Sequence, residues 1–199
     1  RAVSTSVSEP AIRIALAFPG QGTQRTGMAR DFHDASAAAR EVFAAASDAL
    51  QLDVEALCFE PDPRLDLTEF AQPAIVTAEI AMLAAIRDEL GLDACAYGGH
   101  SLGEYSALVA AGVLDVGAAV TLVRERGRFM QEAVPVGEGA MAAVLGMERE
   151  TVERLCEEAA SGEVLAPANF NCPGQITIAG HTGAVQRAVE KVKQEGKKA

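Results

Sequence analysis

The chain has 199 residues, a formal net charge of −11 and a hydrophobic content of 49%. This composition predicts a globular protein with one sizeable core, or one domain and part of another. The acidic charge argues against nucleic acid as the main partner, because phosphate binding needs a basic face. No uninterrupted apolar run approaches membrane-spanning length and the first residues lack the order of a secretory signal, so no membrane is expected.

Four cysteines are scattered along the chain without C-x-x-C spacing: Cys58, Cys95, Cys156 and Cys172. Scattered cysteines without paired spacing are typical of reduced thiols in the cytoplasm. We therefore expect a cytoplasmic location and no metal site.

The N-terminal part of the sequence begins with a Ser-rich, aperiodic stretch, residues 1–10, which we interpret as a disordered leader. An apolar run over 11–18 predicts a buried strand that ends at Pro19. The glycines around Gln21 permit a loop whose N–H groups point into a cavity, although an ordinary tight turn is equally compatible. Helices are predicted over 32–50 and 68–90, the second with Pro73 near its start and Gly91 as its stop.

A G-x-S-x-G pattern at residues 99–103 singles out Ser101. In this pattern small residues let a strand turn sharply into a helix and expose the serine hydroxyl beside free helix N–H groups, which stabilise an oxyanion. The alternative is that Ser101 only caps the helix. A predicted strand over 94–97 and a predicted helix over 102–111 supply the context that the nucleophile requires.

The next predicted helix, 116–133 with Asp115 as N-cap, carries Arg126 inside its apolar arc. The other members of that arc are Val116, Ala119, Val120, Leu122, Val123, Phe129, Met130 and Ala133. A guanidinium is seldom buried without an anion, so Arg126 needs a carboxylate from the protein or from a ligand. A structural ion pair or a side chain that reaches the edge remains an open alternative. Arg124 and Arg128 are predicted to be solvated.

The C-terminal part predicts the order strand, helix, strand, strand, helix, over residues 139–145, 148–160, 164–170, 175–179 and 182–196. This order is a ferredoxin-like split βαβ unit without its last strand. We therefore expect a large α/β domain with a parallel sheet over 11–135, a small ferredoxin-like domain over 136–199, and a chain truncated before the fold is complete.

Five segments in order resemble the malonyl-CoA:acyl carrier protein transacylase family, which includes enzymes of bacterial fatty acid synthesis and acyltransferase domains of polyketide synthases. They are residues 18–24 (FPGQGTQ), 99–108 (GHSLGEYSAL), 126–131 (RGRFMQ), 139–143 (GAMAA) and 171–175 (NCPGQ). The resemblance covers about residues 12–189. It implies an α/β-hydrolase-like large domain with an inserted ferredoxin-like domain.

The resemblance also implies roles for individual residues. Ser101 matches the family's nucleophile, and the backbone N–H groups of Gln21 and Leu102 match its oxyanion hole. Arg126 matches the arginine that binds the malonyl carboxylate. A leucine after the serine, here Leu102, resembles family members that select malonyl over methylmalonyl groups. His100 adjoins the nucleophile and is interpreted as pocket lining.

The family's catalytic histidine has no counterpart in this sequence, because none of His33, His100 and His181 matches it. It is expected beyond residue 199. We therefore expect residues 1–199 alone to be nearly inactive, and to need the remainder of their own chain or a complementary fragment.

The implied reaction carries malonyl from malonyl-CoA to the phosphopantetheine thiol of acyl carrier protein through a malonyl-serine ester, with ping-pong kinetics and no cofactor. Both CoA and the carrier are anionic, so a local basic rim is expected. Its candidates, which alternatively only solubilise two helices, are Arg124, Arg128, Lys191, Lys193, Lys197 and Lys198. A polyketide rather than a fatty acid pathway, a serine esterase or thioesterase, and a non-catalytic carrier-docking module remain alternatives.

Overall fold

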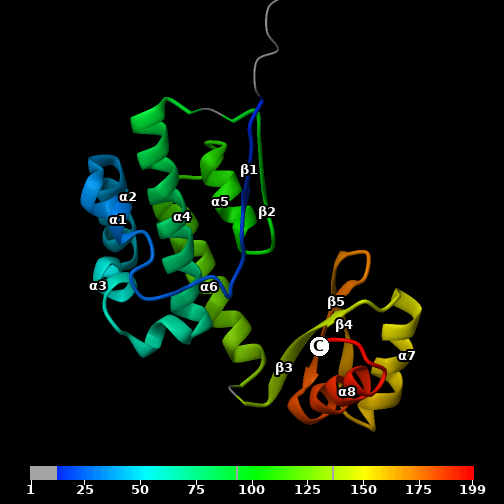
Figure 1. The fold of residues 1–199 in the computed structure, drawn as a ribbon. Coiled ribbons are helices and arrows are strands. Elements are labelled where there is room, and N and C mark those ends of the chain that lie inside the picture. Colours follow the sequence, from blue (N-terminus) through cyan, green and yellow to red (C-terminus); the bar gives the residue numbers. More distant parts are fainter. Residues whose placement is uncertain (1–12, 93, 136) are drawn as a thin grey trace, which may run out of the picture. The chain divides into compact units, whose positions relative to one another are not determined.

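The computed structural model describes residues 13–92, 94–135 and 137–199. They form two compact units, which are divided between Met130 and Gln131. This division lies shortly before the boundary at residue 135 that the sequence suggested. Each unit packs helices against a small β-sheet (Figure 1).

The first unit contains a parallel pair of strands, which confirms the predicted parallel α/β arrangement. Its elements are β1 (Ala15–Phe18), α1 (Arg30–Ala35), α2 (Ala37–Leu50), α3 (Val54–Phe59), the 3-10 helix η1 (Pro63–Asp66), α4 (Thr68–Leu90), β2 (Ala96–Gly99), α5 (Gly103–Ala110) and most of α6 (Val116–Ala133). Phe18 at the end of β1 lies opposite Gly99 at the end of β2. The loops that follow the two strands are therefore neighbours.

Both strands of this sheet begin later than the sequence predicted. β1 begins at Ala15 rather than at residue 11, and residues 11 and 12 lie outside the described part. β2 covers Ala96–Gly99 rather than 94–97. The apolar run predicted the strand itself but not its ends, because the first glycine of the G-x-S-x-G pattern still pairs with β1.

The helix predicted over 32–50 is broken at Ser36, and this prediction was wrong. Ser36 has extended backbone angles, and its Oγ accepts a hydrogen bond from the N–H of Ala39. This bond caps α2 and satisfies one of its free N–H groups. The alanine-rich run that follows Ser36 hid the break.

The long helix α4 has the predicted bounds, Thr68–Leu90. Gly91 adopts the left-handed conformation and donates its N–H to Arg87 O at 2.9 Å, which ends the helix. α4 is long and apolar enough to cross a membrane, but 72% of its apolar window is buried inside the protein. Such burial is typical of the core helix of a soluble protein.

The helix α6 also has its predicted bounds, and Asp115 Oδ1 caps it by accepting from the N–H of Ala118 at 2.7 Å. Its buried side chains include Ala119, Val120 and Val123. Four apolar residues of the predicted arc are exposed instead, Leu122, Phe129, Met130 and Ala133. The buried face is therefore narrower than the pattern predicted, and it includes Gly127, which lies against the backbone of α4.

The second unit has the predicted order of strands and helices. It contains β3 (Gly139–Leu145), α7 (Arg149–Ala160), β4 (Leu165–Cys172), β5 (Gln175–His181) and α8 (Thr182–Gln194). The antiparallel sheet has the order β3-β5-β4, and Lys198 forms an antiparallel bridge with Leu145 at the other side of β3. Val144, Ile176 and Ile178 lie in a core that α7 and α8 share.

Candidate functional site

Ser101 lies on a tight turn between β2 and α5. Its φ of 53° is in the left-handed region, which residues other than glycine seldom adopt. Gly103 closes the turn by donating its N–H to His100 O at 3.0 Å. A strained backbone between strand and helix, with the serine exposed, is the geometry of a nucleophile elbow.

Two glycines allow this elbow to lie directly on the end of β1. A Cβ on Gly99 would overlap the backbone of Gly103, and a Cβ on Gly103 would overlap the backbone of Phe18 and Pro19. His100 also donates its N–H to Phe18 O at 3.1 Å. The position of Ser101 is therefore fixed by backbone contacts.

The two backbone donors that the resemblance implicated, the N–H groups of Gln21 and Leu102, come from loops that touch. A Cβ on Gly20 would lie 3.0 Å from His100 O, so the loop after β1 packs on the elbow. Neither N–H donates a hydrogen bond within the described part of the chain. Both N–H groups are thus without a protein acceptor in the described residues, and an oxyanion-hole role for them stays a prediction.

Arg126 on α6 joins the elbow through its guanidinium. One terminal nitrogen donates to Ser101 Oγ at 3.0 Å, and the other donates to Gln72 Oε1 at 2.8 Å. The guanidinium carbon lies 6.0 Å from the centre of the Tyr105 ring, within cation–π range. No Asp or Glu pairs with Arg126 among the described residues, so its charge has only neutral protein partners there.

Gln72 is a residue of this network that the sequence interpretation missed. Its side chain is fully buried, and its Nε2 lies 3.3 Å from both Gln21 Oε1 and Met130 Sδ. A continuous set of contacts therefore connects Gln21, Gln72, Arg126 and Ser101. The sequence signal that could have identified Gln72 is a single amide side chain in an apolar stretch of α4, and the structure shows that every residue of this stretch is buried.

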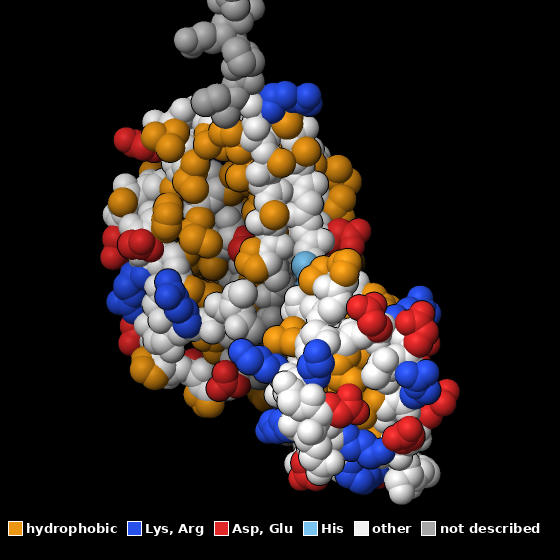
Figure 2. All heavy atoms as spheres, turned by 45° about the vertical axis from the view of Figure 1, so that its right-hand side comes forward, with side chains coloured by type: hydrophobic (Ala, Val, Ile, Leu, Met, Phe, Trp, Pro, Cys, Tyr) orange, Lys and Arg blue, Asp and Glu red, His pale blue; other side chains and the backbone are white. Residues whose placement is uncertain are grey.

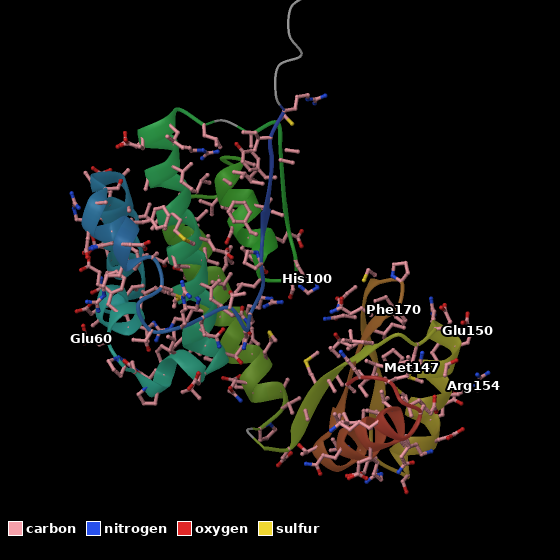
Figure 3. The ribbon with its side chains drawn as sticks, in the orientation of Figure 1. Glu60, His100, Met147, Glu150, Arg154 and Phe170 are labelled. Carbon is pink, nitrogen blue, oxygen red and sulfur yellow. The ribbon has the colours of Figure 1, made fainter. Side chains whose placement is uncertain are left out.

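The three histidines occupy different surroundings. His100 stands at the end of β2 and points away from the helices of its unit (Figure 3), with its ring beside Gly20. His33 contacts the Phe43 ring edge-on and lies 3.3 Å from a carboxylate oxygen of Glu55. His181, in the second unit, accepts from a backbone N–H. A pocket-lining role for His100 stays a prediction.

Several of the cations proposed for a basic rim have acidic partners. Arg124 was predicted to be solvated, and this was wrong, because it pairs with Glu69 at 3.1 Å and donates to Leu50 O. Arg128 pairs with Glu125 at 2.7 Å, and Lys191 pairs with Glu158 at 2.7 Å. Over Gln131–Ala199, basic and acidic side chains are interspersed (Figure 2).

A buried acid, Glu79 of α4, lies next to α5. It is 6% exposed, and its Oε2 accepts a hydrogen bond from Ser106 Oγ. Its Oε1 has no hydrogen-bond partner among the described residues. Burial raises the pKa of Glu79 to about 7, against the opposing effect of the Ser106 hydrogen bond.

The buried cysteines are unsuited to thiolate chemistry. Burial raises the pKa of the Cys58 thiol to about 12 and that of Cys156 to about 11. All four cysteines are free thiols. Over 13–92, 94–135 and 137–199, no group of three or more His, Cys, Asp or Glu side chains is placed to hold a metal ion.

Comparison with known proteins places the chain among acyltransferases. Residues 16–199 match the acyl transferase domain family. The malonyl CoA-acyl carrier protein transacylase of Escherichia coli (strain K12) is 48% identical over 187 residues, which cover 94% of this chain and 60% of that protein.

Solved structures agree with this comparison. The malonyl CoA-acyl carrier protein transacylase of Coxiella burnetii superimposes with a TM-score of 0.87 at 46% identity, over 94% of this chain and 60% of that one. A malonyl-transacylase in complex with a type II polyketide synthase acyl carrier protein gives 0.86 at 44% identity, over 94% and 61%. The chain therefore spans about 60% of the length of these proteins.

Proposed function

Because the chain belongs to the acyl transferase domain family, we propose that the protein carrying it transfers malonyl from malonyl-CoA to the phosphopantetheine thiol of acyl carrier protein. The relatives above are malonyl CoA-acyl carrier protein transacylases. The observation in this chain that carries the proposal is the contact between Ser101 and Arg126. A permanent cation without an acidic partner among the described residues lies 3.0 Å from the hydroxyl on the elbow.

Arg126 gives the site its selectivity for a substrate with a free carboxylate. A guanidinium fork binds a carboxylate through two parallel hydrogen bonds. An acetyl thioester has no carboxylate and would leave the half-buried cation with neutral partners only. Gln72 holds one edge of the guanidinium, so the group is oriented before the substrate arrives.

The reaction has two half-reactions on one hydroxyl. Ser101 Oγ attacks the thioester carbonyl, and the N–H groups of Gln21 and Leu102 stabilise the resulting oxyanion. The C–S bond then breaks, a malonyl-serine ester remains, and the hydroxyl proton passes through a general base to the CoA thiolate. The carrier's thiol attacks this ester in the same way and releases Ser101. Neither step requires a cofactor, and ping-pong kinetics follow.

The surrounding architecture is part of this proposal. The strand order β3-β5-β4 with Lys198 bridged to β3 supports a ferredoxin-like small domain whose fourth strand would begin at that bridge. We place this domain as an insertion in an α/β-hydrolase-like large domain, with the general base in the part of the family fold that this chain does not span. A soluble enzyme with reduced cysteines suits the cytoplasm.

The test is to incubate the complete protein that carries this chain with malonyl-CoA and to measure its intact mass. The expected result is a stable malonyl adduct that peptide mapping assigns to Ser101, and that disappears on addition of the carrier's thiol. The Ser101→Ala variant is the control and should form no adduct. Rapid hydrolysis without an adduct would support a serine esterase or thioesterase, and absence of both reactions would support a carrier-docking module.

The acceptor pathway has two candidates. The curated relatives are named malonyl CoA-acyl carrier protein transacylases, which favours the carrier of fatty acid synthesis as the first candidate. The complex with a type II polyketide synthase carrier favours a polyketide acceptor as the second candidate. Comparing the rates of transfer to one carrier of each kind separates the two.

A further inference from the structure

Glu79 and Ser106 form a buried contact that the proposed reaction leaves unused. Ser106 Oγ donates to Glu79 Oε2, and the two residues are 0% and 6% exposed, respectively. Glu79 Oε1 is buried and has no hydrogen-bond partner in the described part of the chain. A carboxyl group with one of its oxygens unsatisfied is a costly feature unless the group is neutral.

This contact connects α4 with the helix that begins at the elbow. Ser106 lies in the first turn of α5, which starts at Gly103, and Gly103 packs against the backbone of β1. Gln72, which holds Arg126, precedes Glu79 by seven residues and therefore lies on the same face of α4 two turns earlier. A change in the packing of α4 on α5 would thus act on Ser101 and on Arg126 together.

No cation compensates Glu79 within the described residues. Arg25 lines the same cavity of about 370 Å³ but forms no ion pair with it. Cys58 of α3, a neutral thiol, lies 4.0 Å from Ala74 O of α4, and Asp31 of α1 lies beside the last turns of α4. Arg124 and Arg126 of α6 contact the first turns of α4 instead.

We propose that Glu79 is a positioning residue for the Ser101 elbow, and that loss of its proton loosens the contact between α4 and α5 and slows acyl loading of Ser101. The reasoning is that a buried carboxylate with one hydrogen bond and no cation must recruit water, and water that enters from the cavity beside Glu79 competes with Ser106 and loosens the contact between the two helices. Burial raises the pKa of Glu79 to about 7, so the change falls near neutral pH. This inference rests on the proposed function for its kinetic consequence only.

The kinetic test compares the rate of malonyl loading on Ser101 in the protein and in its Glu79→Gln variant between pH 6 and 8.5. The amide keeps a hydrogen-bond acceptor for Ser106 but does not ionise. Taking the ratio of the two rates cancels any titration that both proteins share, including that of the general base. If only the protonated form loads, the ratio of wild-type to variant rate should fall with a midpoint near 7 and should be roughly 30-fold lower at pH 8.5 than at low pH.

Two further variants separate positioning from general stability. Ser106→Ala removes the hydrogen bond that opposes the effect of burial, so the midpoint should move to higher pH. Glu89→Gln changes an exposed acid on the same helix and should leave the ratio flat. A flat ratio for Glu79→Gln, or an unmoved midpoint in Ser106→Ala, would overturn the proposal.

A second readout does not need the reaction. The amide resonances of Ser101 and Leu102 should shift with pH near 7 in the wild-type protein, and this transition should vanish in Glu79→Gln. If no malonyl adduct forms but the transition is seen, the proposed function fails and the coupling stands. If the adduct forms and the transition is absent, the coupling is wrong.

Discussion

Gly127 of α6 lies directly against the backbone of α4, and these two helices position Arg126. A Cβ on this residue would lie 2.5 Å from Thr68 O and 2.8 Å from Glu69 Cα. Both are backbone atoms of the first turn of α4, so they cannot rotate away as a side chain would. We expect the Gly127→Ala variant to separate α6 from α4 at the position where Arg126 meets Gln72.

The magnitude follows from these contacts. An ordinary contact is about 3.5 Å, so the helices must separate by roughly 1 Å. Overpacking of this size costs about 1–3 kcal/mol, while alanine in place of glycine inside a helix recovers about 1 kcal/mol. The variant should therefore lose at most about 2 kcal/mol of stability. The same displacement stretches the 2.8 Å hydrogen bond from Arg126 to Gln72, and misplacement by 1 Å can lower a rate by about 100-fold.

The assay measures the free energy of unfolding by urea and the rate of malonyl loading on Ser101 by mass spectrometry, under conditions where the variant is folded. Gly117→Ala in the same helix is the matched control, because its Cβ would meet only the side-chain atoms of Ala49 and Asp115, at 3.3 and 3.4 Å. It should keep the wild-type loading rate. Wild-type loading by the folded Gly127→Ala variant would refute the argument, as would an equal loss in both variants.

Three further predictions concern charge and protonation. Arg126→Met should lower malonyl loading by about 100-fold or more while changing acetyl loading far less, because only malonyl needs the cation; parallel losses on both acyl-CoAs would contradict this. The pKa of Glu79 is raised, so the wild-type protein loses stability as pH rises from 4.5 to above 7, whereas the Glu79→Gln variant does not. The variant should therefore gain about 3 kcal/mol of stability relative to wild type over this window, which denaturation curves at pH 5 and 8 measure. Cys58 should resist alkylation at pH 8 while the exposed Cys95 reacts, as peptide mapping of the folded protein will show.

The sequence predicted those elements whose ends carry a local signal. α4 ends at Gly91, which takes the left-handed conformation that glycine permits, and α6 begins where Asp115 caps it. The elbow could be located because strand, glycines and helix follow each other within a short stretch around Ser101. In each case the physical cause lies within a few residues of the feature.

Features that depend on distant residues could not be predicted in this way. Arg124 looks like a surface charge on its own helix, and its partner Glu69 is 55 positions away in the chain. The role of Gln72 as the support of Arg126 likewise exists only after α4 and α6 have packed. A buried amide or acid in an apolar helix, such as Gln72 or Glu79, was a usable signal, but its partner was not visible in the pattern.

The left-handed backbone at Ser101 restricts which amino acid can serve there as an alcohol. Threonine would retain a hydroxyl group, but its branched Cβ is incompatible with a positive φ. Asparagine or glycine would tolerate the backbone and supply no hydroxyl. Serine is thus the natural amino acid that supplies an aliphatic hydroxyl group and tolerates the positive φ. Engineering a different oxygen nucleophile at this position would therefore have few options.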